Sequence, residues 1–344
     1  MKMTDLYQTL SDKIKQVDLD KIYKGFKSYP FALYDAKTIY LENETIPWNE
    51  AFIGNTAITY EGKTMAIWDL RYQIEDTDIF ASKLIHEMFH VHQLKNSESR
   101  FPNELKGLDY KYDELGMALK IMETACLQKS IQKNEKEEFN RFLAYRKHRE
   151  SLYPENLDYE SKIEVVEGTA RYVELMALKQ LDQKKYSDEL DKILSGLSIH
   201  SEYIPIRIAS YNIGACVLIA CDKYGIPIEN QIFGNNTTYS EKLLKNIKPE
   251  EPIFSPNAID LSFVEEYNRR IEANIAKILE AKCQKTIGEQ ITGLDPMNTY
   301  KIGIRLYCKN FIRIRKEERD LFIFGESVVE QLPCSVIVYQ KETP

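Results

Sequence analysis

The sequence contains no apolar run long enough to cross a bilayer. A membrane helix needs roughly 18 consecutive apolar residues, whereas the longest apolar stretch runs only from Ile213 to Cys221 and predicts a buried helix. The N-terminal residues, MKMTDLYQTLSDKIKQ, also lack the apolar segment followed by small residues that marks a secretory signal. These absences predict a cytoplasmic protein that binds no membrane.

Paired cysteines and an excess of positive charge are lacking as well. The six cysteines include no Cys-x-x-Cys pair and no tight disulfide spacing, which favours reduced thiols. The formal net charge is -7, whereas nucleic-acid binding requires clustered Lys and Arg. Charged residues make up 29% of the chain and hydrophobic residues 43%, which is typical of a soluble globular protein. Composition therefore argues against nucleic acid as a partner, and it leaves the oligomeric state open.

The periodicity of the apolar residues changes twice along the chain and predicts an α+β fold. An amphipathic helix is expected over 4–28, and a small β layer follows, with a hairpin turn at Glu61-Gly62-Lys63. The expected early strands are 31–34, 38–41, 57–60 and 64–68. The expected helices are 78–95, 108–133, 135–150, 158–182, 205–224 and 260–283, with Gly225 ending the fifth and a loop at 233–240. After about residue 295 the expected strands are 300–308, 311–315, 321–324 and 335–339.

This order divides the chain into three expected regions. Residues 1–75 form an N-terminal helix and β layer, residues 76–290 a mainly helical body, and residues 291–344 a small β tail.

The chain has only five histidines, and three of them fall within residues 86–92. His86 and His90 stand four residues apart, so on a helix both imidazoles lie on one face and can reach one ion. Glu87 lies beside that ion, where it can take a proton from a water molecule on the metal. His92 lies roughly 200° around the helix from His90 and should point away. The spacing predicts a zinc site with Glu87 as general base.

A catalytic zinc site needs a third protein ligand, and the best candidates lie in segment 163–174. Glu164, Glu167, Arg171 and Glu174 fall on one face of the expected helix. Gly168 and Ala170 are small, which should let this helix approach the metal helix closely. Spacing alone does not choose between Glu164 and Glu167.

Taken together, these motifs resemble the gluzincin metallopeptidases. The His-Glu-x-x-His motif at 86–90, followed by Glu-Gly-Thr-Ala at 167–170, is most similar to the aminopeptidase N-like branch. The resemblance implies a zincin-like fold in which Glu167 is the third zinc ligand and Glu174 orients a ligand. It also implies a strand before the metal helix, 57–60 or 64–68, whose free edge pairs with an extended peptide substrate.

A further similarity follows at residue 211. Tyr211-Asn-Ile-Gly-Ala resembles the Tyr-x-x-Gly-Ala segment of that family. In the family this tyrosine stabilises the oxyanion of the tetrahedral intermediate. His200 is the alternative for this role.

The sequence also departs from the family pattern. Val166 stands where the branch has Asn, and a long insert separates His90 from Glu167. Segments 114–123 and 144–149 of that insert are similar to bacterial zincin-type proteins that carry such an insertion. No Gly-Ala-Met-Glu-Asn segment precedes the metal helix, which argues against binding of a free substrate amino terminus.

The predicted function is a zinc metallopeptidase acting on a peptide or protein, with endopeptidase, aminopeptidase and non-peptide amide hydrolysis left open. Two alternatives are a zincin-fold protein that binds metal or peptide without hydrolysis, and a helical interaction protein with a chance motif.

Overall fold

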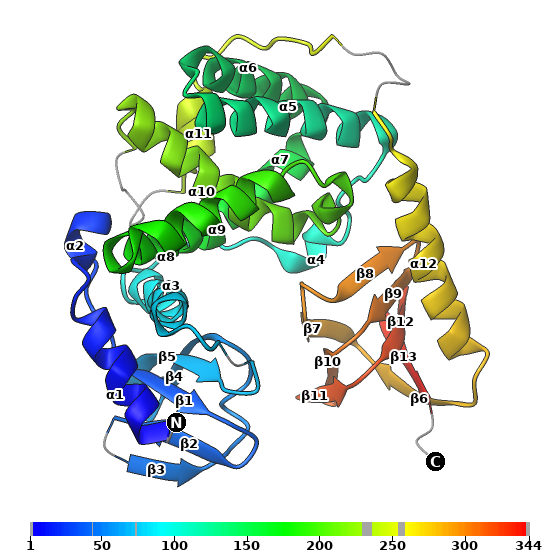
Figure 1. The fold of residues 1–344 in the computed structure, drawn as a ribbon. Coiled ribbons are helices and arrows are strands. Elements are labelled where there is room, and N and C mark those ends of the chain that lie inside the picture. Colours follow the sequence, from blue (N-terminus) through cyan, green and yellow to red (C-terminus); the bar gives the residue numbers. More distant parts are fainter. Residues whose placement is uncertain (1–2, 43, 73, 229–235, 254–258, 342–344) are drawn as a thin grey trace.

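A small N-terminal sheet, a helical body and a C-terminal pair of sheets follow one another along the chain (Figure 1). The structure is a computed structural model, and it describes residues 3–341 apart from 43, 73, 229–235 and 254–258. The expected α+β class is therefore confirmed. Among the described residues, no helix has both the length and the apolar content that a membrane crossing requires.

The N-terminal sheet has five strands, and the first strand of the β4–β5 hairpin lies at one edge. Its order is β3-β2-β1-β5-β4, with β1 parallel to β5 and the other pairs antiparallel. The elements of this region are α1 (Met3–Ile14), α2 (Leu19–Ile22), β1 (Phe31–Tyr34), β2 (Thr38–Leu41), β3 (Glu44–Pro47), β4 (Thr56–Tyr60) and β5 (Lys63–Asp69). Glu61 and Gly62 both have positive φ, as a tight two-residue hairpin turn requires. Of the two candidate edge strands, only β4 lies at the edge.

The single helix expected over 4–28 is wrong, because the chain turns after Ile14 and a short second helix follows. The side chain of Asp18 accepts a hydrogen bond from the backbone N–H of Lys21 and caps that second helix. An aspartate that bonds nearby backbone favours a helix start over a helix interior. The strand β3 was also not expected.

The helical body contains most of the expected helices with shifted ends, but the single helix expected over 158–182 is divided into three elements, and the helix at 183–196 was not expected. Its elements are α3 (Thr77–Lys95), α4 (Glu104–Gly107), α5 (Glu114–Lys133), α6 (Lys136–Leu152), α7 (Pro154–Ile163), the π-helix η1 (Glu164–Gly168), α8 (Thr169–Leu181), α9 (Gln183–Gly196), the 3₁₀-helix η2 (His200–Tyr203), α10 (Ile206–Tyr224) and α11 (Tyr239–Leu244). The helix expected from 108 begins only at Glu114, because Asp113 caps it through the N–H of Gly116. Gly225 ends α10 in the left-handed conformation, as predicted.

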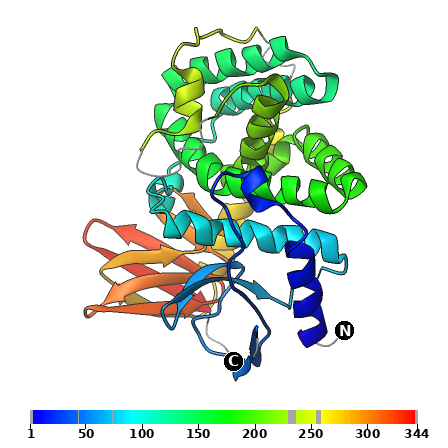
Figure 2. The same cartoon turned by 90° about the vertical axis from the view of Figure 1, so that its left-hand side faces the viewer.

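One helix lies between the sheet and the rest of the body. Figure 2 shows α3 lengthwise, with the N-terminal sheet on one side and the helical body on the other. Its apolar side chains pack in one buried cluster with residues of α1, β1, β5 and α8. Helix α3 is therefore packed on both sides, against the sheet and against α8. The expected loop at 233–240 lies partly outside the described residues, and its described end holds Thr238, which caps α11.

The C-terminal strands begin earlier than expected, and the single strand expected over 300–308 is wrong, because a turn at Gly303, which has positive φ, divides it into two paired strands. The elements are α12 (Ser262–Leu279), β6 (Cys283–Gly288), β7 (Gln290–Leu294), β8 (Thr299–Ile302), β9 (Arg305–Cys308), β10 (Phe311–Lys316), β11 (Arg319–Phe324), β12 (Ser327–Leu332) and β13 (Ser335–Lys341). They form one sheet of order β6-β13-β12-β9-β8 and one of order β11-β10-β7. The sequence of β6 is polar and its side chains are largely exposed, so hydrophobic periodicity does not reveal it.

Candidate metal centre

Helix α3 places His86 and His90 on one face. Asp76 caps the helix by accepting hydrogen bonds from the N–H groups of Asp78 and Ile79. The two imidazole rings lie 4.9 Å apart between centroids and nearly perpendicular to each other. His86 is buried and the side chain of His90 is largely buried, so neither ring is hydrated as a surface histidine would be.

The carboxylate of Glu167 faces both histidines across the gap between α3 and η1. Glu167 Oε2 lies 3.2 Å from Nε2 of His90 and 3.7 Å from Nε2 of His86. Donor atoms of all three residues lie within 4.8 Å of one another, and this is the only such trio among the described residues. Two ligands held tetrahedrally at 2.0–2.1 Å from one zinc ion are about 3.3 Å apart. The 3.2 and 3.7 Å distances from Glu167 to the two histidines are close to this spacing, as ligands of one ion would be.

The outer nitrogen of each imidazole is already bonded, which leaves the inner nitrogen for a metal. His86 Nδ1 lies 3.1 Å from Glu174 Oε2, and His90 Nδ1 lies 2.7 Å from Gln93 Oε1. Gln93 Nε2 donates to the carbonyl oxygen of Val166, which fixes the orientation of its amide. Because both acceptors can only accept, each Nδ1 carries the proton and each Nε2 can offer its lone pair. This donor set fits a metal ion.

The charges at the trio also favour a cation. Burial alone would lower the pKa of His86, but the carboxylates of Glu167 and Glu174 raise it to about 10. Burial would raise the pKa of Glu167, but the two histidines hold it well below its usual range. The anionic carboxylates thus draw a proton onto the imidazole. A metal ion would supply that positive charge in the same place.

Glu87 lies in the same cleft but outside the donor trio. Its side chain is buried, and this burial raises its pKa, while the two neighbouring histidines oppose the rise. A buried carboxylate next to the ligands, with access to the cleft, is suited to proton transfer at the metal.

Only one of the two candidate third ligands, Glu167, faces the histidines. The expectation that Glu164 and Glu167 share one helical face is wrong, because residues 164–168 form a π-helical turn. Glu164 instead points to the opposite side, where it binds Arg146. A π turn holds one more residue than an α turn and so shifts the direction of the side chains that follow.

Two glycines let η1 approach α10 rather than α3. A Cβ on Gly168 would lie 2.8 Å from Gly214 Cα, and a Cβ on Gly214 would lie 2.9 Å from Gly168 Cα. The expectation that Gly168 makes room for the metal helix is therefore wrong, whereas Ala170 does lie in the cluster that contains α3. This close approach fixes the distance between Glu167 on η1 and the site residues of α10.

Replacing Gly214 with Ala is expected to lower the free energy of unfolding by about 1–3 kcal/mol, because the added methyl group would press on backbone atoms of Gly168 and Glu164. Denaturant titration followed by circular dichroism measures this change. Gly196→Ala is the control, since its methyl group would make only an ordinary contact with Glu202. Equal stability of the two variants would contradict the close-packing interpretation.

Helix α10 contributes two side chains to the site, and the sequence revealed only one. The ring of Tyr211 stacks 6.4 Å from that of His86. Arg207, one turn earlier, donates to Glu167 Oε1 at 3.0 Å and is also ion-paired with Glu104. Arg207 thus holds one oxygen of Glu167 and leaves the other for the histidines. Its position four residues before Tyr211 puts both on one face of α10, but that spacing alone does not show that Arg207 reaches Glu167.

The trio lies in a cleft of about 440 Å³ that reaches the edge of the sheet. Thr56 and Ala57 of the edge strand β4 line one part of it. Leu94, Phe101 and Pro102 line another, and the first two have 47% and 44% of their surface exposed.

The two remaining histidines of the prediction lie elsewhere. His200 stacks on Tyr203 in η2 and is not among the residues that line the cleft. His92 points into an aromatic cluster, where its Nδ1 lies 3.0 Å from the hydroxyl of Tyr29, in agreement with its predicted structural role.

No protein-family model, no curated protein and no solved structure matches this chain. The interpretation of the site therefore rests on its own residues and geometry.

Proposed function

We propose that the protein is a zinc-dependent hydrolase of the gluzincin type, with a zincin-like fold, that cleaves peptide bonds. The observation that carries this proposal is the convergence of His86, His90 and Glu167, from two separate helices, on one point beside Glu87. A chance motif on an ordinary helix gives no reason for a distant carboxylate to meet both imidazoles. The alternative of a helical interaction protein is thereby disfavoured.

Zinc is the metal that suits this donor set. Two imidazoles and one carboxylate with a position left for water are the ligands of catalytic zinc in metalloproteases. When bound, zinc acts as a Lewis acid that lowers the pKa of water to about 7 and polarises a carbonyl group. Glu174 and Gln93 orient the two histidines for this role through their contacts with Nδ1.

Glu87 is proposed to move the proton. Its carboxylate accepts a proton from the attacking water and then delivers it to the nitrogen of the leaving amine. One residue can do both, because the two events follow each other on the same side of the scissile bond. An intact base in the cleft favours catalysis over a protein that only binds metal.

The edge strand supports an extended peptide as the substrate. Within the described sheet, β4 is hydrogen-bonded along one side only, to β5. The unpaired N–H and C=O groups of an edge strand are a template for a peptide backbone. Leu94, Phe101 and Pro102 add apolar surface to the cleft, so a substrate with an apolar side chain near the scissile bond is favoured.

Tyr211 is proposed to donate a hydrogen bond to the oxyanion that forms on the substrate carbonyl. Tyr211→Phe is expected to reduce kcat by about 10²–10³, because one oxyanion donor is lost while ligands and base remain. Steady-state kinetics on a peptide that the wild-type protein cleaves measure this loss. His200→Ala should leave kcat unchanged, and a larger loss in that variant than in Tyr211→Phe would assign the role to His200 instead.

A peptide library, analysed by mass spectrometry, tests the proposed function. Cleavage is expected at defined positions, is expected to stop after removal of metal with a chelator, and is expected to return with added zinc. Cleavage that survives complete metal removal would contradict the proposal. Zinc binding without cleavage of any peptide would favour the non-hydrolytic zincin-fold alternative.

A further inference from the structure

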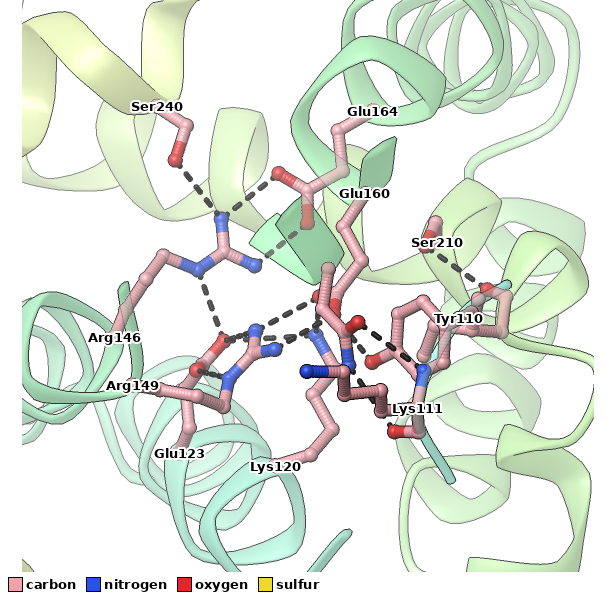
Figure 3. Close-up of polar contacts among 12 residues, drawn as sticks. Tyr110, Lys111, Lys120, Glu123, Arg146, Arg149, Glu160, Glu164, Ser210 and Ser240 are labelled. Carbon is pink, nitrogen blue, oxygen red and sulfur yellow. Dashed lines mark hydrogen bonds and ion pairs between the residues drawn. The ribbon is translucent and has the colours of Figure 1, made fainter. Parts of the chain in front are cut away.

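The insert between the two metal motifs holds a fully buried network of charged side chains. Three cations meet three carboxylates in it (Figure 3), and each of the six side chains is at most 1% exposed. The members are Lys120 and Glu123 of α5, Arg146 and Arg149 of α6, Glu160 of α7 and Glu164 of η1. The formal charges cancel, as burial of this many ions requires.

The network joins the insert to the π turn that carries the third metal ligand. Arg146 donates to both oxygens of Glu164, at 2.8 and 2.6 Å, and its Nε donates to Glu123 at 2.9 Å. Arg149 in turn bridges Glu123 and Glu160. The chain of ion pairs therefore runs from α5 through α6 to Glu164, only three residues before Glu167.

The two hydrogen bonds from Arg146 fix the orientation of the Glu164 carboxylate as well as its distance. The planar guanidinium of Arg146 donates from Nε to Glu123 and from its two terminal nitrogens to Glu164 (Figure 3). Bidentate pairs of arginine and carboxylate are strong and geometrically specific. On the far side of the turn, Gly214 approaches Glu164 so closely that even a methyl group would lie 3.0 Å from its Cα. The backbone of η1 is thus clamped between α6 and α10.

Stability alone does not account for such a network. Buried ion pairs lose their hydration on folding, and well-packed apolar residues of similar volume often stabilise a protein as much or more. Apolar contacts are not directional, so they would not orient the side chain at position 164 as the two hydrogen bonds from Arg146 do. The same turn must direct Glu167 at His86 and His90 with the accuracy that metal binding demands.

We propose that Arg146 is a positioning residue for the metal centre, and that the insert formed by α5 and α6 holds the π turn in the register that directs Glu167 at the two histidines. This inference rests on the proposed role of Glu167 as a metal ligand. Arg146 itself touches neither metal nor substrate in this account. Its effect reaches the site through Glu164 and the backbone of η1.

The double variant Arg146→Met/Glu164→Leu tests this inference without leaving an unpaired charge. It removes one cation and one carboxylate, so Lys120, Arg149, Glu123 and Glu160 remain neutral as a group. Lys120→Met/Glu160→Leu is the matched control. It removes the same charges from the same network and keeps the pair of Arg146 with Glu164.

Zinc affinity, measured by competition with a chromophoric chelator, and thermal unfolding of the metal-free proteins are the two readouts. Zinc affinity is expected to fall about 10- to 100-fold in Arg146→Met/Glu164→Leu, and to stay within about threefold of wild type in the control. A purely structural network would alter the unfolding temperature of both variants and the zinc affinity of neither. Glu164→Gln, which keeps the size of the side chain, provides the same test if the double variant does not fold.

The outcomes separate this inference from the proposed function. Wild-type zinc affinity in both Arg146→Met/Glu164→Leu and Glu164→Gln would overturn the positioning role and leave the metal site standing. An equal loss of zinc affinity in the control would overturn it too, since the affinity would then not depend on the pair of Arg146 with Glu164. A wild-type protein that binds no zinc would overturn both proposals.

Discussion

Glu87→Gln is expected to lower kcat by about 10²–10⁴ while leaving the zinc content of the protein unchanged. Glutamine has the size and shape of glutamate but cannot accept a proton from water at neutral pH, and general-base catalysis contributes a factor of this size. The residue is outside the donor trio, so the metal should be retained. The variant therefore separates proton transfer from metal binding.

Kinetics on the best peptide of the library, with metal analysis of the same sample, measure both quantities. Glu150→Gln is the matched control, since this carboxylate lies on α6 and is paired with Lys147, away from the cleft. The control should keep wild-type kcat. Undiminished hydrolysis by Glu87→Gln would contradict the proposed mechanism, and loss of zinc in that variant would make Glu87 a metal ligand instead.

The part of the site that lies within one helix could be predicted from the sequence. His86, Glu87 and His90 follow one another on α3, and helical geometry alone determines which of them share a face. The same reasoning directed His92 away from the site, into the aromatic cluster where the structure places it. The order of β layer, helical body and β tail followed equally from local periodicity.

Contacts between elements could not be predicted in this way. Helical spacing put Glu164 and Glu167 on one face, but a π turn between them sends one carboxylate to Arg146 and the other to the histidines. Such a turn depends on packing against α6 and α10, and the local pattern of apolar residues does not show these contacts. Arg207 and Gln93 were missed for the same reason, since their roles arise only where α10 and α3 meet η1.

The polar sequences of the C-terminal sheets also limited what could be predicted from the sequence. The strand β6 exposes most of its side chains and is defined by its pairing with β13. Hydrophobic alternation is therefore weak there, and the tail was expected to begin later than it does. The break between α1 and α2 was missed because the capping by Asp18 was not recognised in an otherwise amphipathic stretch.

Glu167→Ala is expected to lose most of the bound metal. The substitution removes the only carboxylate of the donor trio and leaves two neutral imidazoles, which are a weak site for a divalent ion. It also frees Arg207 from one of its two carboxylate partners, an effect that is expected to be small beside the loss of the ligand.

Glu104→Gln is the control for this effect. Glu104 is the other partner of Arg207 and lines the same cleft, but it is not a member of the trio. Its amide can still accept a hydrogen bond from the guanidinium, so the zinc content should stay close to that of the wild type.

Elemental analysis of the purified wild-type protein, beside Glu167→Ala and Glu104→Gln, tests whether the trio holds a zinc ion. We expect about one zinc ion per chain in the wild type and in Glu104→Gln, and much less than one in Glu167→Ala. A wild-type protein that holds no metal, even after incubation with zinc, would contradict this expectation, as would undiminished zinc in Glu167→Ala.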